Sequence, residues 1–162
     1  MTSLFNGKDL SAWMPINGKG VVPWIVQDGY LEVKPGTGNI LTREKFGDYQ
    51  LHVEFWLPLM ADKRSQERAN SGVYQHGLYE IQVLDSYHNP TYRYGGCGAI
   101  YGQKDPDKDA CKPPERWQTY DITFHAPRFG TMSPSLARAK TSTGSCTCLK
   151  WNCPRDLALN SG

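Results

Sequence analysis

The strict two-residue alternation of apolar and polar side chains over residues 49–57 constrains the fold more than any other feature. Successive side chains of an extended strand point to opposite faces, so this period fits a β-strand and not a helix. The segment therefore predicts a strand that packs one face on a core and turns the other away from it. The apolar face would carry Leu51, Val53, Phe55 and Leu57, and the other face His52, Glu54 and Trp56.

Further strands and turns follow along the chain up to residue 129. Asp28 and Gly29 supply the positive φ angles of a type I′ turn, which predicts a hairpin between 24–27 and 30–33. Short strands at this spacing, with turn signals between them, indicate a single antiparallel β-sandwich. The other predicted strands lie at 39–42, 71–75, 79–85, 98–101 and 117–125.

Composition agrees with this fold and excludes several classes of function. The chain has 162 residues, 39% of them apolar, and carries nine tyrosines and five tryptophans. Its formal charge of +2 gives no electrostatic reason to bind nucleic acid or an anionic membrane. No run approaches the roughly 18 apolar residues of a membrane span, so none is expected. The N-terminus lacks the pattern of a signal peptide, which taken literally predicts a cytoplasmic protein.

The five cysteines do not form a metal-binding pattern. Cys97 and Cys111 flank a polar loop, and the other three lie near the end of the chain. Free thiols are one interpretation. A Cys97–Cys111 disulfide is the alternative if the protein is exported.

The sequence changes character after residue 129. Residues 130–162 are rich in Ser, Thr, Ala and Cys, and they keep neither a strand nor a helix period. We therefore divide the chain into a sandwich domain, 1–129, and an unpatterned tail, 130–162, which reads as if translated out of frame. The tail is not expected to form strands, which would leave the sandwich incomplete at its C-terminal end.

Several motifs of the patterned part resemble, in order, those of the 3-keto-disaccharide hydrolase family. They are LFNGKDLSAW at 4–13, WIVQDGYL at 24–31, NSGVY at 70–74, YEIQVLD at 79–85, GAIY at 98–101 and WQTYDI at 117–122. Gln118 stands where the family's pattern has Asn, which is a mild departure. After Phe129 the family continues with strands that carry an Asn-Gly turn, and no such pair occurs here.

The resemblance implies a concanavalin A-like jelly roll, in which two curved antiparallel sheets hold the ligand on the concave face. It implies action on 3-keto-glycosides, which a partner sugar 3-dehydrogenase produces. The family name says hydrolase, and some relatives look like lyases that eliminate the aglycone. The resemblance also suggests a periplasmic or secreted location, against the literal interpretation of the N-terminus.

Strand phase points independently to candidate site residues. His52, Glu54 and Trp56 share the non-core face of one predicted strand, and Glu80 and Gln82 share that of another. If the two strands share a sheet, these side chains line one concave cleft. Sugars bind such surfaces because their C–H faces stack on aromatic rings and their hydroxyls pair with polar groups. A solvated outer face is the alternative.

A 3-keto sugar has an acidic proton at C2, so a general base could remove it and expel the C1 substituent. The base candidates are Glu80, Glu54 and His76, and His52 is a less favoured fourth candidate. Asn70, Gln82 and Tyr101 could orient hydroxyl groups, and Asp85 could join them only if its strand bulges. A divalent cation on Glu80, Asp85 or His76 could polarise the ketone, although no metal motif is present.

Two other functions stay open on the sequence alone. A retaining glycosidase needs two carboxylates about 5 Å apart, and residues 80–84 offer a glutamate only at the first position. The keto-dependent route is therefore favoured over direct hydrolysis. A non-catalytic carbohydrate-binding domain would need the same aromatic and polar face but no base, and an inactive fragment is the third alternative.

Overall fold

The computed structural model describes residues 1–128 and 148–151. Within these ranges the regular structure is β-strand, apart from one 3-10 turn, η1 (Ser65–Glu67). Over the same residues, no helix has the length and apolar character needed to cross a membrane.

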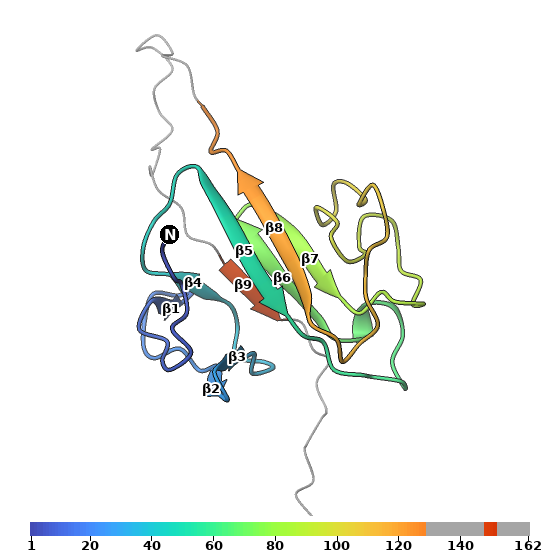
Figure 1. Cartoon of the computed structure of the whole chain (residues 1–162), viewed down its shortest axis with the longest axis horizontal. Coiled ribbons are helices and arrows are strands. Elements are labelled where there is room, and N and C mark those ends of the chain that lie inside the picture. The colour runs from blue at the N-terminus through green and yellow to red at the C-terminus, as the bar shows by residue number, and fades with distance from the viewer. Residues whose placement is uncertain (129–147, 152–162) are drawn as a thin grey trace, which may run out of the picture.

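Seven of the nine described strands form two packed layers. Figure 1 shows one layer, β5 and β8, crossing in front of the other, which contains β6, β7 and β9. Every strand pairing is antiparallel. The first layer pairs β5 (Tyr49–Phe55) with β8 (Gln118–Phe124). The second layer runs in the order β1 (Trp13–Pro15), β4 (Ile40–Thr42), β9 (Cys148–Trp151), β6 (Asn70–Gln75) and β7 (Tyr79–Leu84).

The main core lies between the two layers. Val73 of β6 and Val83 of β7 are buried there, together with Leu57 and Met60 beyond the end of β5. The apolar halves of the strands pack against them, namely Leu51, Val53, Phe55, Ile81, Tyr120 and Ile122. Burying these faces against each other removes apolar surface from water, which is the main force holding the layers together. The predicted two-sheet antiparallel sandwich is confirmed.

The N-terminal part builds a second core beside β1 and β4. Trp13, Trp24 and Ile40 are buried in it, and the indole nitrogens of Trp13 and Trp24 donate to the carbonyl oxygens of Leu4 and Gly38. The strands β2 (Ile25–Gln27) and β3 (Tyr30–Glu32) form the predicted hairpin. Asp28 and Gly29 take φ angles of 49° and 79°, as a type I′ turn requires.

The prediction that the tail contributes no strand is wrong for four residues. Cys148–Trp151 form β9, which pairs with β4 on one side and with β6 on the other. Backbone pairing needs no particular side-chain period, so the unpatterned composition did not reveal it. The out-of-frame hypothesis loses its structural argument at these residues, and the rest of 130–162 lies outside the described residues.

The predicted strand at 98–101 is also wrong. Ile100 forms an isolated bridge with Ile81 in place of a continuous strand pairing, and Gly98 and Gly102 turn the backbone at positive φ on either side. Gly98 still donates to the Gln82 carbonyl at 2.9 Å, and Gln82 donates to the Ala99 carbonyl at 2.9 Å. The segment therefore docks on the edge of β7 without continuing the sheet.

Candidate active site

The predicted cleft of Glu54, Glu80, Gln82 and Trp56 does not exist as one surface. β5 pairs with β8, and β7 belongs to the five-stranded sheet. Because the apolar halves of both strands face the common core, their polar halves point away from it in opposite directions. Glu54 and Glu80 therefore lie on opposite outer faces of the sandwich.

His52, Glu54 and Trp56 lie on the exposed outer face of the β5–β8 layer. His52 Nδ1 lies 2.7 Å from Asp121 Oδ1 across the strand pair, and Glu54 Oε1 lies 4.0 Å from His52 Nε2. The hydrogen bond to Asp121 is the main reason that the pKa of His52 is raised above 6.5. This face is a solvated ion cluster with an exposed indole beside it.

Glu80 lies on the opposite outer face, where it is 6% exposed. The hydroxyl of Tyr74, its cross-strand neighbour on β6, donates to Glu80 Oε2 at 2.6 Å. The Glu80 side chain lies over Gly72, where any Cβ would overlap the carboxylate. The Glu80 carboxylate is thus buried flat against the sheet, because Gly72 beneath it has no side chain and the Tyr74 hydroxyl beside it donates a hydrogen bond.

Two further tyrosines approach this carboxylate from the segment between β7 and β8. The hydroxyls of Tyr92 and Tyr101 hydrogen-bond to each other, and Tyr92 interacts electrostatically with Glu80. Partial desolvation of the Tyr92 hydroxyl, followed by its bond to Tyr101, raises the pKa of Tyr92 to about 12. Tyr92 therefore stays protonated at neutral pH and can act as a hydrogen-bond donor.

A network of side-chain amides borders Glu80 on the same face. Gln66 of η1 accepts from Asn70 Nδ2 at 3.0 Å and from Gln82 Nε2 at 2.9 Å. Gln66 Nε2 in turn donates to Thr91 Oγ1 at 2.6 Å and to the Gly95 carbonyl at 2.9 Å. The network fixes the 91–95 segment to β6 and β7, which holds Tyr92 near the carboxylate.

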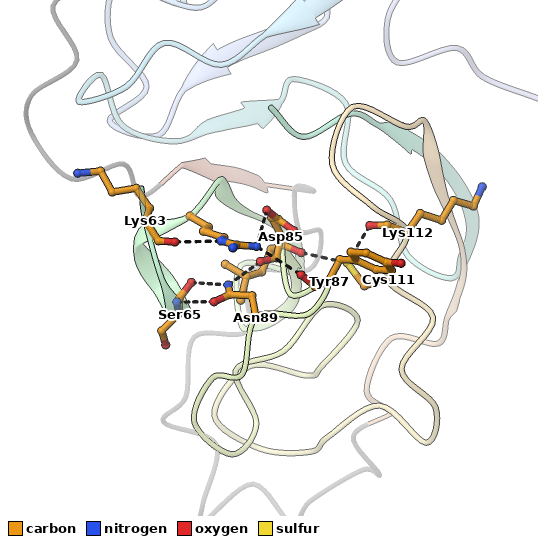
Figure 2. Close-up of polar contacts among 9 residues, drawn as sticks. Lys63, Ser65, Asp85, Tyr87, Asn89, Cys111 and Lys112 are labelled. Carbon is orange, nitrogen blue, oxygen red and sulfur yellow. Dashed lines mark hydrogen bonds and ion pairs between the residues drawn. The ribbon is translucent and has the colours of Figure 1, made fainter. Parts of the chain in front are cut away.

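Asp85 lies just past the end of β7 and is fully buried. Arg68 Nη1 lies 3.2 Å from Asp85 Oδ2 and also donates to the Tyr87 carbonyl, while Asn89 donates to the Asp85 carbonyl at 2.7 Å. Figure 2 shows Asp85, Tyr87 and Asn89 together in this cluster. These contacts give Asp85 a role in anchoring the segment after β7, not a place on the Glu80 face.

His76 is also separate from Glu80. It lies in the turn between β6 and β7, where its ring packs on Tyr49 of β5 and Phe124 of β8. Its Nε2 lies 3.2 Å from the Phe46 carbonyl oxygen. The ring therefore closes one end of the space between the layers.

Of the nine predicted site residues, the structure brings together Glu80, Gln82, Asn70 and Tyr101 and places the other five elsewhere. Sequence reasoning missed Gln66, Tyr74 and Tyr92. Tyr74 carried a usable signal, because it lies on the predicted strand 71–75, four residues after Asn70, and an extended chain turns both to the same face. The other two lie in irregular segments, where no period indicates which way a side chain points.

No group of three or more His, Cys, Asp or Glu side chains suited to a metal ion occurs in the described part of the chain. A surface pocket of about 520 Å³ adjoins the site, lined by residues between Ser86 and Asp109 that include Thr91 and Tyr92. The candidate site contains one buried carboxylate, three phenols and three side-chain amides. It can accept a proton, donate hydrogen bonds to a developing negative charge and pair with hydroxyl groups.

The fold and this face define a β-sandwich protein whose polar sheet face suits a polyhydroxylated ligand. Residues 1–137 match the sequence model of the 3-keto-alpha-glucoside-1,2-lyase-like domain, and the chain belongs to this family. No curated protein matches the chain.

Two solved structures from Parabacteroides distasonis ATCC 8503, both provisionally described as glycosyl hydrolases, are similar to this one. The first is 35% identical with a TM-score of 0.79, over 91% of this chain and 74% of that one. The second is 21% identical with a TM-score of 0.64, over 92% and 86%, and supports the fold alone.

Proposed function

We propose that this chain cleaves 3-keto-glycosides by removing the C2 proton with Glu80. The observation that carries the proposal is the Glu80 carboxylate itself, which is buried, fixed by Tyr74 and faced by Tyr92 and Tyr101. A carboxylate held in one position by its neighbours is pre-organised to accept a proton from a bound substrate.

The reaction follows from the chemistry of the ketone. The C3 carbonyl acidifies the C2–H bond, Glu80 takes that proton, and the electron pair forms an enolate on O3. The hydroxyl group of Tyr92 or Tyr101 donates a hydrogen bond to the enolate oxygen. The enolate then expels the C1 substituent, which leaves as an alcohol after it gains a proton. Stopping there is elimination, and adding water at C1 completes hydrolysis.

The amide network supports the same assignment. Gln66, Asn70 and Gln82 lie beside Glu80 and offer the paired donors and acceptors that sugar hydroxyls require. An upstream enzyme that oxidises the C3 hydroxyl to a ketone must supply such a substrate.

The test compares Glu80→Gln with Glu54→Gln. Both variants replace a carboxylate by an amide of the same shape, but Glu54 lies on the opposite, solvent-exposed layer. Release of a chromogenic aglycone from a 3-keto-glucoside should fall by roughly 10²–10⁴-fold in Glu80→Gln and stay unchanged in Glu54→Gln. A loss below about tenfold in Glu80→Gln would reject Glu80 as the base.

Two controls separate this reaction from its alternatives. The unoxidised glucoside should not be cleaved, because it lacks the acidic C2 proton. In D2O, deuterium incorporation at C2 of unreacted ketone would report proton removal directly. Binding of the keto sugar without aglycone release or exchange would instead indicate a carbohydrate-binding domain.

A further inference from the structure

Two cysteines that the proposed function does not use meet beside the end of β7. Cys97 is 8% exposed, and its Sγ lies 3.0 Å from the Tyr120 hydroxyl. Cys111 is half-buried, and its Sγ lies 3.6 Å from the Leu84 carbonyl oxygen. Figure 2 shows Cys111 beside the Asp85 cluster.

Ser86 links the two cysteines, through the backbone of Cys97 and the thiol of Cys111. The backbone N–H of Cys97 donates to Ser86 Oγ at 3.2 Å, and Ser86 also hydrogen-bonds to the Cys111 thiol. A further interaction joins the Cys97 thiol to the Cys111 thiol directly. The fold therefore brings together two side chains from opposite ends of the 97–111 segment, as a disulfide requires.

We propose that Cys97 and Cys111 form a disulfide bond that closes the 97–111 segment against the end of β7, by exchange with a small-molecule disulfide such as oxidised glutathione. The proposal is independent of the proposed function, since neither sulfur belongs to the Glu80 face.

The two thiols differ in a way that sets the order of exchange. The interaction with Cys97 lowers the pKa of Cys111 to about 6, while the same interaction and burial raise the pKa of Cys97. Cys111 is also the more accessible of the two. Cys111 is therefore the attacking thiolate and Cys97 the resolving thiol.

The exchange balances in two steps. The Cys111 thiolate attacks one sulfur of oxidised glutathione, forms a mixed disulfide and releases one glutathione thiolate. Cys97 then loses its proton to solvent, attacks Cys111 Sγ and releases the second glutathione. The protein gives up two electrons and two protons overall, and one oxidised glutathione becomes two reduced ones.

The bond would restrain a segment that carries part of the candidate active site. Tyr101 lies within 97–111, and the backbones of Gly98 and Ala99 are hydrogen-bonded to the backbone of Gln82. Closing a loop of about 15 residues restricts the unfolded chain and raises Tm by roughly 6–12 °C for a domain of this size.

The experiment equilibrates the full chain with oxidised glutathione, alkylates the remaining thiols and digests the protein with trypsin. The expected product is a linked pair of peptides, 94–104 and 109–116, that separates on reduction. In denaturant, where the fold no longer brings Cys97 and Cys111 together, the five cysteines should instead pair in several combinations. Free Cys97 and Cys111 after equilibration, or a bond from either to Cys146, Cys148 or Cys153, would overturn the proposal.

Single variants test the order of attack. Cys97→Ser should stop at a mixed disulfide between Cys111 and one glutathione, whereas Cys111→Ser should leave Cys97 largely unmodified. Equal modification of both variants would contradict the assignment. If either variant fails to fold, the Tm values of the oxidised and reduced wild-type protein are compared instead. An oxidised form with a Tm no higher than that of the reduced form would contradict the proposed loop closure.

Discussion

The carboxylate of Glu80 occupies the space in which a side chain at position 72 would stand. The two residues lie on neighbouring strands, and the absence of a Cβ at Gly72 lets the carboxylate lie flat on the sheet. The position of the proposed base is thus set by a residue that takes no part in the chemistry.

Gly72→Ala should therefore displace Glu80. We expect a destabilisation of about 1–3 kcal/mol from overpacking. We also expect turnover of a 3-keto-glucoside to fall by about 10²-fold, because a displacement of around 1 Å is enough to spoil a catalytic geometry. Gly47→Ala is the matched control, since nothing lies within 4 Å of its added Cβ. Unchanged turnover in Gly72→Ala would show that the position of Glu80 does not matter.

Tyr74→Phe should weaken catalysis while preserving the fold. The change removes only the hydroxyl that donates to Glu80 at 2.6 Å. Hydrogen bonds to a charged group contribute about 1.5–3 kcal/mol, so we expect kcat to fall by roughly 10- to 100-fold. Steady-state kinetics beside Tyr79→Phe, an exposed tyrosine on the adjoining strand, provide the comparison. Equal kinetics in the two variants would argue against a positioning role for Tyr74.

The Arg68–Asp85 ion pair should matter far more than surface ion pairs. Arg68→Ala leaves the fully buried Asp85 carboxylate without its cation, which costs about 3–5 kcal/mol at a buried pair. Arg93→Ala breaks the exposed Arg93–Asp105 pair and should cost about 1 kcal/mol or less. Urea unfolding of both variants measures the difference. Similar values for the two would mean that Asp85 is hydrated or otherwise compensated.

The His52–Asp121 contact should give a pH dependence with a definite sign. Because the pKa of His52 is raised in the folded protein, its contribution to stability is fully present below the ordinary value of 6.5. That contribution is lost as the pH rises through the folded value. An NMR titration of the His52 ring should give a midpoint above 6.5 that moves down in Asp121→Asn, which removes the main cause of the shift. An unmoved midpoint would assign the shift to Glu54 instead.

Strand phase predicted which face each strand buries but not which strands pair. The alternations in β5 and β7 correctly separated Val53 and Val83 from Glu54 and Glu80. Alternation is a property of one strand, however, and two strands with the same pattern can share a sheet or face each other across a core. Here they face each other across the core, so the residues predicted to line one cleft lie instead on two opposite outer faces.

The irregular segments limited the prediction of the site in a different way. The face on which Glu80 and Gln82 lie could be predicted because they alternate with the apolar residues Ile81 and Val83. Tyr92 and Gln66 reach the same face through turns whose direction depends on contacts formed only in the folded chain. The division of the chain at residue 129, the catalytic roles and a place outside the cytoplasm stay predictions.

The position of β9 has a consequence for how the chain is made. In the five-stranded sheet, β4 and β6 do not pair with each other, and each pairs with β9. While residue 148 is still inside the ribosome, the emerged chain can form β1–β4 and β6–β7 but cannot join them. Both halves then present an unpaired edge, which is the surface on which chains aggregate. Synthesis of β9, rather than of the candidate site residues, therefore sets the moment at which the described strands of this sheet can join.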